Sequence, residues 1–146
     1  MIQDALARFA SAQSGTLSTA HTDIIDTLAA GNDYRGCFFV FQVSTAFTQV
    51  GTASATKLNV QLQTSDVEAF TDSDDVTLAT SNTWTSSQLA AGKYWAVRVP
   101  TGAKRYIRAY NNVSGASAGS AFGAGAWNSF LTPDIDVRID RRYLLD

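Results

Sequence analysis

The chain has 146 residues, of which 45% are hydrophobic and 16% are charged, and its net charge is −2. This length suits one compact domain, and the hydrophobic share excludes wholesale disorder. The slight negative charge excludes a general electrostatic attraction to nucleic acid or to an anionic membrane. No apolar run approaches the ~20 residues that span a bilayer, and the N-terminus does not have the features of a signal peptide. We therefore expect one domain over residues 1–146, synthesised in the cytoplasm, with no nucleic acid and no membrane among its partners.

The residue usage predicts an all-β fold. The sequence has one glutamate, twelve aspartates and many Thr, Ser and Gly residues, so strong helix formers for an exposed surface are scarce and turn formers are abundant. At the N-terminus, the apolar positions of residues 2–13 fit either one short helical turn or an arm that lies on another subunit. We therefore set residues 1–20 apart as an extended N-terminal arm.

The first two strands that we expect carry strong apolar signals. Residues 37–43, CFFVFQV, form a short run rich in Phe and Val, which predicts a central strand. The single cysteine, Cys37, opens this run and is expected to be a small buried hydrophobic residue rather than a reactive thiol. Residues 58–64, LNVQLQT, alternate between apolar and polar side chains, which predicts a strand with one face toward the core. The core face comprises Leu58, Val60 and Leu62, and the other face comprises Asn59, Gln61 and Gln63.

Polar turns separate the later predicted strands. Residues 67–70 and 76–80 flank the turn cluster TDSDD, and we expect them to be neighbouring strands. Residues 94–99 and 104–113 are joined through Pro100-Thr101-Gly102, which predicts a hairpin. Residues 126–130 form a further predicted strand. With the strand that follows near the C-terminus, about eight short strands predict an antiparallel β-sandwich, a jelly roll or a small barrel.

The C-terminal part contains one more alternating segment between less regular ones. Residues 134–140, DIDVRID, predict a strand with a charged face and an apolar face. The apolar face comprises Ile135, Val137 and Ile139. Residues 114–126 are so rich in Gly, Ala and Ser that they predict either a flexible loop or a close-packed interface strand. Residues 141–146, RRYLLD, carry more cations and apolar groups than an unattached tail needs, so we interpret them as a docking C-terminal tail.

The stretch KRYIRAYNN, residues 104–112, mixes cations with tyrosines, as a groove for single-stranded nucleic acid does. Strict alternation, however, divides the arginines between the two faces of a strand. One face comprises Arg105, Ile107 and Ala109, and the other comprises Tyr106, Arg108 and Tyr110. Because the cations do not form one track, we interpret the stretch as a strand whose arginines bridge an edge or a subunit contact.

Several segments, taken in order, resemble one protein family. They are RFASAQ, FFVFQVSTAFT, LNVQLQTSD, LAAGKYWAVRVPTGAKRYIRAYNNVSG and the late segment DVRIDRR. In this combination the chain resembles the jelly-roll capsid cement (decoration) proteins of tailed bacteriophages. The most specific piece is a strand that ends in Arg-Val-Pro, followed by a turn with glycine and by Arg-Tyr-Ile-Arg. The chain departs from the family in its longer C-terminal tail.

The resemblance implies a structural virion protein that has no catalytic activity and no cofactor. Such a protein assembles on the outside of the expanded phage head and ties neighbouring major capsid protein subunits together, which stabilises the head against the pressure of the packed DNA. The expected partners are the phage major capsid protein and further copies of the chain itself, as a homodimer or a homotrimer. The expected location is the outer surface of the capsid in the virion.

Two sets of residues are candidates for these contacts. Chain ends can reach beyond a compact sandwich, so we expect the shell contacts there. The predicted capsid-binding residues are Arg8, Phe9, Arg141, Arg142 and Tyr143. The predicted hairpin is rich in Tyr and Arg, which are frequent at protein interfaces. The predicted self-association residues are Trp95, Arg98, Tyr106, Arg108 and Tyr110.

The sequence has no motif that marks a catalytic site or a metal site. A Ser-His-Asp triad needs a histidine, and the one histidine, His21, is predicted to be a surface or turn residue. The aspartates of residues 72–75 have neither the glycine nor the distal glutamate of an EF-hand loop. Those of residues 134–140 alternate along a strand at about 6 to 7 Å. We interpret the two groups as a turn and a solvated strand face.

A carbohydrate- or receptor-binding β-sandwich module is the alternative function. The polar neighbours of Trp84 in SNTWTSS could leave its ring exposed as a stacking platform, although a partly buried loop anchor is the favoured interpretation. Trp95 and Trp127 are expected in the core or at an interface, because each lies in a predicted strand among apolar or small residues.

Overall fold

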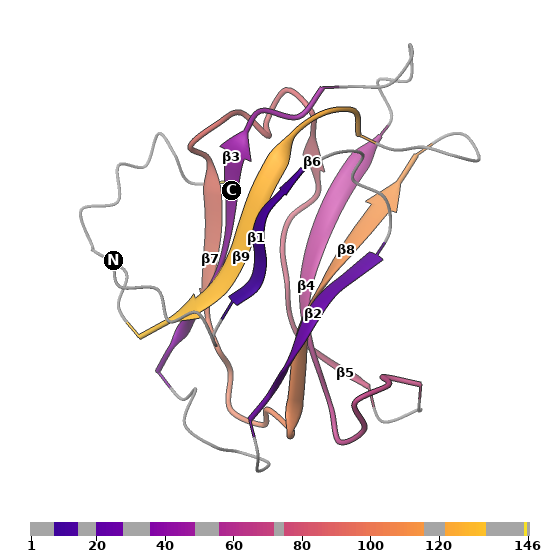
Figure 1. Cartoon of the computed structure of the whole chain (residues 1–146), viewed down its shortest axis with the longest axis vertical. Helices are drawn as coiled ribbons and strands as arrows, with labels where there is room; N and C mark the ends of the chain where they lie inside the picture. Colours follow the sequence, from indigo (N-terminus) through magenta and orange to yellow (C-terminus); the bar gives the residue numbers. More distant parts are fainter. Residues whose placement is uncertain are drawn as a thin grey trace.

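The computed structural model of the chain is all-β (Figure 1). It describes residues 8–14, 20–27, 36–48, 56–71, 75–115, 122–133 and 145. These described residues form nine strands and no helix, as the residue usage predicts. In chain order the strands are β1 (Arg8–Ser14), β2 (Ala20–Asp26), β3 (Phe38–Thr45), β4 (Lys57–Ser65), β5 (Val76–Thr80), β6 (Trp84–Thr85), β7 (Tyr94–Arg98), β8 (Tyr106–Ser114) and β9 (Ala126–Thr132).

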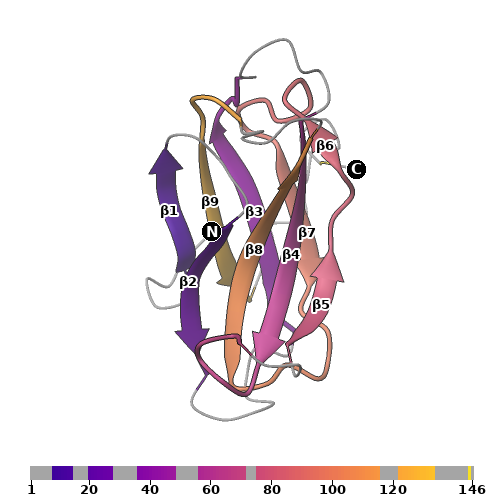
Figure 2. The same ribbon diagram turned by 90° about the vertical axis from the view of Figure 1, so that its right-hand side faces the viewer.

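The strands form two antiparallel sheets that pack face to face (Figure 2). The first sheet has the order β1-β9-β3-β7, and the second sheet has the order β2-β8-β4-β5, with the short β6 added to β4. Each of the first four strands pairs with a later strand, and the later strands follow in reverse order: β1 pairs with β9, β2 with β8, β3 with β7 and β4 with β5. This arrangement is one long hairpin rolled into two sheets, which is a jelly roll. The predicted fold class is therefore confirmed.

Apolar side chains fill the space between the two sheets. From the second sheet, Leu58, Val60 and Leu62 of β4 point inward and are fully buried, which confirms the alternation predicted for this strand. From the first sheet, Phe39 and Phe41 of β3 belong to the same core cluster. Strand β3 lies between β9 and β7, as predicted for a central strand. Each such side chain contributes about 1.5–3 kcal/mol when it is fully buried, and this layer holds the sheets together.

The connection through Pro100-Thr101-Gly102 crosses from one sheet to the other. Strand β7 pairs with β3 in the first sheet, whereas β8 pairs with β2 and β4 in the second sheet. The predicted hairpin between residues 94–99 and 104–113 is therefore wrong. Gly102 has a φ of 102°, which favours glycine, so the turn itself forms where the sequence indicates one. Local turn chemistry does not determine whether the next strand stays in the same sheet.

Residues 8–14 form an edge strand of the first sheet and are not an extended arm. Phe9 is fully buried, and its ring meets that of Phe39 edge-on with 5.6 Å between the ring centroids. Pairing with β9 and burial of Phe9 hold this segment against the sandwich. Both the helical alternative and the arm assignment are thus corrected for these residues, while residues 1–7 and 15–19 lie outside the described part of the chain.

The other predicted strands have mixed outcomes. Residues 67–70 belong to the loop between β4 and β5 and form no strand, so the strand predicted there is wrong. The neighbouring strands that this loop connects are β4 and β5. The strand predicted at residues 126–130 is confirmed as β9. The predicted strand at residues 134–140 lies outside the described residues, and so does most of the Gly-, Ala- and Ser-rich stretch, at residues 116–121.

Trp84 is a core residue. Its fully buried ring stacks on Phe41 with 6.1 Å between the ring centroids and meets Trp95 edge-on at 6.2 Å. Strand β6 brings Trp84 to this place because it pairs with Leu58 of β4. Both the exposed platform and the partly buried loop anchor are therefore wrong for this residue. Of the two residues expected in the core or at an interface, Trp127 belongs to the core cluster, and Trp95 is partly buried and packs against that cluster.

Cys37 packs against the core cluster, is partly buried and forms no disulfide bond. Burial raises the pKa of its thiol, which disfavours the nucleophilic thiolate. The packing role expected for this cysteine agrees with the structure, although its burial is less complete than expected.

Replacement of Trp84 by alanine removes a large, fully buried side chain and leaves a cavity beside Phe41 and Trp95. We expect the free energy of unfolding to fall by about 3–5 kcal/mol. Guanidinium unfolding followed by circular dichroism measures this loss. Val67→Ala, at a side chain that is 39% exposed, is the control and should change the unfolding free energy by less than about 0.5 kcal/mol. A similar small change for Trp84→Ala would contradict the burial of this ring.

Candidate functional site

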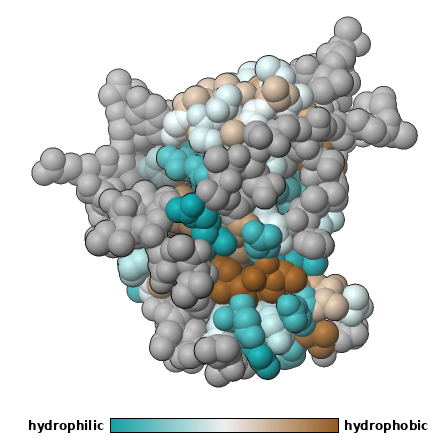
Figure 3. All heavy atoms as spheres, in the orientation of Figure 1, coloured by the Kyte–Doolittle hydropathy of each residue, from teal (hydrophilic) through white to brown (hydrophobic). Residues whose placement is uncertain are grey.

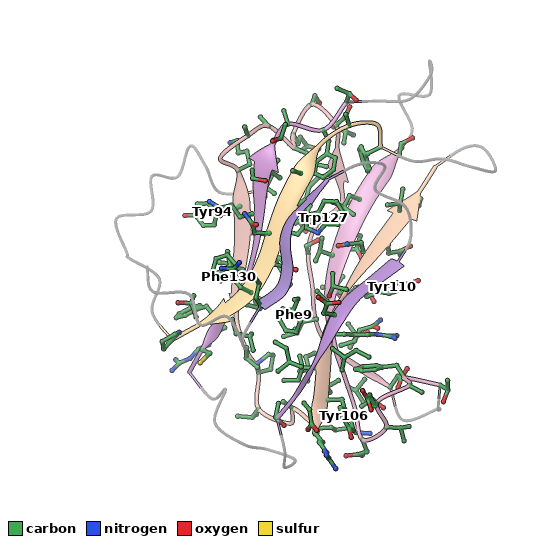
Figure 4. The ribbon with its side chains drawn as sticks, viewed as in Figure 1. Phe9, Tyr94, Tyr106, Tyr110, Trp127 and Phe130 are labelled. Carbon is green, nitrogen blue, oxygen red and sulfur yellow. The ribbon has the colours of Figure 1, made fainter. Side chains whose placement is uncertain are left out.

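The outer face of the second sheet gathers polar and aromatic side chains from two adjacent strands. Along β8, Ile107 and Ala109 point inward and are fully buried, so the predicted alternation is confirmed for them. The outward side chains of β8 are Tyr106, Arg108, Tyr110 and Asn112. The outward side chains of the neighbouring β4 are Asn59, Gln61 and Gln63. We call this set of outward residues the ladder face; Tyr106 and Tyr110 are labelled in Figure 4.

A series of hydrogen bonds runs along the ladder face. Arg108 Nε donates to Gln63 Oε1 at 2.9 Å, and Gln63 Nε2 donates to Gln61 Oε1 at 2.9 Å. Gln61 Nε2 donates to Asn59 Oδ1 at 3.4 Å, and Asn59 Nδ2 donates to the backbone oxygen of Ser81 at 2.6 Å. These bonds point the same way along β4, so each amide polarises the next one. Each side-chain amide uses one of its two N–H groups in the series and keeps the other for an outside partner.

Arg108 anchors one end of this series. Its guanidinium lies 4.0 Å from the ring centroid of Phe70 and 5.7 Å from that of Tyr110. A guanidinium nitrogen is 3.9 Å from a carboxylate oxygen of Asp75, and the Arg108 side chain is 12% exposed. Burial lowers the pKa of Arg108, while Asp75 and Tyr110 act in the opposite direction. Arginine is always protonated in proteins, so Arg108 is a fixed and partly desolvated cation on the ladder face.

The loop after β4 folds back onto the ladder face at Phe70. This residue has a φ of 47°, a left-handed conformation that bulky residues rarely adopt, and it is 7% exposed. The Phe70 N–H donates to the Val67 carbonyl at 3.2 Å, and the Val67 N–H donates to Ser65 Oγ at 3.1 Å. The stacking of Arg108 on the ring offsets the strain of this conformation. Sequence reasoning missed Phe70, because its role depends on a contact with a residue of a distant strand.

The cations that precede β8 each contact a carboxylate. Lys104 Nζ lies 3.1 Å from Asp66, and Arg105 donates to both carboxylate oxygens of Asp26 at 2.9 and 2.8 Å. The hydrogen bond to Asp26 raises the pKa of Arg105 further. Arg105 lies just before β8 with a side chain that is 45% exposed, so the prediction that it shares a face with Ile107 is wrong. The positive charge of this stretch is locally compensated, which disfavours a continuous track for phosphates.

The structure brings together only part of the predicted self-association set. The members on the ladder face are Tyr106, Arg108 and Tyr110. Trp95 and Arg98 lie on β7 in the first sheet instead. Trp95 packs on aromatic rings of the core, and Arg98 is exposed at the end of its strand. One interface for all of these residues would need the hairpin that the structure does not contain.

The predicted capsid-binding residues are also separated. Phe9 is fully buried between the sheets, so its assignment to an outside contact is corrected. Arg8 is partly buried and lies opposite Phe130 in the pairing of β1 with β9. The remaining members lie outside the described residues and are Arg141, Arg142 and Tyr143.

The described surface carries few exposed large apolar side chains. Among the described residues they are Val67 and Val76, at the two ends of the loop between β4 and β5. On the side drawn in Figure 3, a compact hydrophobic patch lies below the centre and hydrophilic residues lie around it. A partner of the ladder face would therefore meet mainly amide, phenol and guanidinium groups.

Within the ranges that the structure describes, no three His, Cys, Asp or Glu residues are grouped as a metal site requires. The described residues also include no helix that is long and apolar enough to cross a membrane. Of the aspartates in the predicted turn, Asp75 faces Arg108, and residues 72–74 lie outside the described part, as do residues 134–140. His21 lies in strand β2 rather than in a turn.

The fold and the ladder face together define a jelly-roll protein with a polar, internally hydrogen-bonded outer face. The model of one protein family, Bbp16, matches residues 9–126, from β1 to the start of β9. The chain belongs to the Bbp16 family, a family of bacteriophage proteins, and this membership indicates a phage structural protein. Among curated proteins, none matches the chain.

Arg108→Lys keeps the positive charge and removes both the Nε donor and the flat guanidinium. We expect the hydrogen bond to Gln63 and the stacking on Phe70 to be lost, with a fall of about 1–2 kcal/mol in the free energy of unfolding. Hydrogen exchange measured by mass spectrometry should be faster in residues 66–71. The control is Arg105→Lys, at an exposed position where an ion pair with Asp26 can persist, and it should leave both quantities unchanged. Equal effects of the two variants would rule out an anchoring role for Arg108.

Proposed function

We propose that this phage protein is a capsid decoration protein, which binds the outside of the expanded head and cements neighbouring major capsid protein subunits. The ladder face is the observation that carries the proposal, and the family match supports it. Tyr and Arg side chains with few exposed apolar groups are typical of interfaces between separately folded proteins. The protein acts through binding alone in this proposal, without catalysis and without a cofactor.

The ladder face is ordered before any partner arrives. Gln61 and Gln63 are held by the amide series, and Arg108 is held by Phe70. Immobilising a long side chain on binding costs about 0.5–1.5 kcal/mol, so a face that is already fixed loses less free energy on association. The second N–H groups of the amides then supply directional contacts at the interface.

We infer that the partner of the ladder face is a second copy of the chain, in a homodimer or a homotrimer. Every amide of the series carries both donors and an acceptor, so the row is complementary to another copy of itself that runs in the opposite direction. A two-fold axis produces this arrangement, because both subunits then use the same patch. The phenol groups of Tyr106 and Tyr110 add aromatic surface with a polar end, which suits the same contact.

Self-association makes the cementing stronger. A symmetric oligomer that touches several shell subunits makes its second binding event intramolecular, which raises avidity by a factor of order 10² to 10⁴. The binding free energy must be overcome before those subunits separate, so decorated heads are more stable. Arg8 and the terminal residues Arg141, Arg142 and Tyr143 are the proposed contacts with the shell.

A carbohydrate-binding module has less support than decoration. The observation that favoured it was an exposed Trp84, and this ring is fully buried. Tyr106 and Tyr110 are partly exposed rings on the ladder face, so a glycan screen forms the second arm of the experiment below.

Co-sedimentation of the purified protein with expanded, undecorated heads of the phage that encodes it tests the proposal. Unexpanded proheads are the control. We expect saturable binding to expanded heads alone, together with a higher rupture temperature of the decorated heads. If the protein binds neither particle, the decoration function is wrong, and binding in a glycan screen would then favour the carbohydrate-binding alternative.

Tyr110→Ala removes a ring from the ladder face and leaves the core intact. We expect the dissociation constant for self-association to rise at least about tenfold, because aromatic residues near an interface centre contribute more than about 1.4 kcal/mol. Sedimentation velocity over a range of concentrations measures this constant. Val76→Ala, at an exposed position of β5, is the control and should have no effect. Oligomers of Tyr110→Ala and Arg108→Ala that persist at low concentration would show that self-association uses another surface.

A further inference from the structure

Three described side chains between the two sheets carry a buried polar atom that has no hydrogen-bond partner in the protein. These atoms are Trp127 Nε1, Ser129 Oγ and Asn111 Oδ1. The residues are 6%, 1% and 2% exposed, in the same order. Buried polar groups in folded proteins are almost always hydrogen-bonded, and an ordered water serves those that no protein group reaches. One water can serve all three atoms if they lie close together.

The strand register places these side chains on the core side of their sheets. Residues directly opposite each other in antiparallel strands share a face. Ser129 of β9 lies opposite Phe41, and Asn111 of β8 lies opposite Val60. Both of these partners belong to the core cluster, and so does Trp127. All three polar atoms therefore point into the space between the sheets.

The alternation along β9 agrees with this placement. Phe130, which follows Ser129 in the chain, is buried but does not belong to the core cluster. The same is true of Val40, its register partner on β3. Figure 4 shows Phe130 on the opposite side of the first sheet from Trp127. Since neighbouring residues of a strand face opposite ways, Ser129 points toward the second sheet.

Strands β9 and β8 lie across from each other in the sandwich. The strand orders of the two sheets begin with β1 and β2, and these two strands contact each other. Strand β9 is next to β1, and β8 is next to β2. The inward side chains of β9 therefore face those of β8 across the core.

The three residues also lie at a similar height along the strands. Phe41, the register partner of Ser129, stacks on Trp84 of the second sheet. Through β4, Trp84 lies in the same row of that sheet as Val113. Asn111 is the next inward residue of β8, about 7 Å from Val113. Ser129 and Asn111 therefore differ in height by about one inward position, and Trp127 is the inward neighbour of Ser129 on β9.

The short side chains at this place leave room for a water. Packed sheets lie about 10 Å apart, so the oxygens of Ser129 and Asn111 do not meet across the core. Ala109, the inward neighbour of Asn111 on β8, is also small. The Trp127 N–H donor and the Asn111 acceptor are both without a partner, so no direct hydrogen bond joins them. A water with hydrogen bonds of about 2.8 Å bridges such a gap.

We propose that one water molecule is bound between the sheets, where it accepts a hydrogen bond from Trp127 Nε1, donates one to Asn111 Oδ1 and has Ser129 Oγ as its third partner. Apolar contacts are not directional, whereas these three hydrogen bonds are. The water thus links β9 to β8 and fixes the position of one sheet relative to the other. This proposal does not depend on the decoration function.

A crystal structure of the full-length protein, at a resolution that shows ordered waters, tests this site directly. We expect one water within about 2.7–3.2 Å of Trp127 Nε1, Asn111 Oδ1 and Ser129 Oγ. A direct hydrogen bond between Trp127 and Asn111 overturns the proposal, and so does the absence of a water at this position.

Asn111→Leu provides a second test in solution, because it removes the acceptor and fills the site with an apolar side chain. Oxygen-17 relaxation dispersion of the solvent measures how many waters stay bound for longer than the protein takes to tumble. We expect the amplitude to fall by the contribution of one water. Asn82→Leu, the same substitution at an exposed position, is the matched control and should leave the amplitude unchanged. Equal amplitudes for the two variants overturn the proposal, and if Asn111→Leu does not fold, the crystal structure of the unaltered chain decides.

Discussion

The apolar layer between the two sheets is the constraint on which the other features of this protein depend. Because side chains alternate along a strand, each residue that enters this layer forces the next one outward. In β4 the inward residues are fully buried, so Asn59, Gln61 and Gln63 point outward at intervals of about 7 Å, close enough for their amides to bond in series. The ladder face is thus a geometric consequence of the packing of the core.

The two outer faces of the sandwich have different chemistry and suit different roles. The outer face of the second sheet is polar and is ordered by hydrogen bonds within the chain. The outer face of the first sheet carries Phe130 and Val40, which are already buried in a single chain. Directional polar groups suit contacts between separately folded proteins, whereas an apolar face suits a permanent cover. The proposed decoration function is consistent with this division, because it requires self-association through one defined surface.

Local alternation was enough to predict the faces of β4 and most of β8 from the sequence, because it depends on residues two positions apart. Membership of a sheet is not local, and the hairpin prediction failed because β7 and β8 join different sheets across a short turn. Trp84 and Phe9 have polar or small sequence neighbours, and their burial follows from pairing with distant strands. Arg108 stacks on Phe70, whose backbone has a left-handed conformation. This contact depends on the conformations of both residues, which no sequence pattern encodes.

The proposed function requires that the ladder face carries protein contacts in the assembled state. Hydroxyl-radical footprinting with mass spectrometry tests it most directly, by comparison of dilute free protein with protein bound to expanded heads. We predict that oxidation of Tyr106 and Tyr110 falls severalfold in the bound state, while that of the exposed Val76 on β5 stays unchanged. If both tyrosines remain as reactive as in the free protein while other side chains become protected, the ladder face is not the contact surface.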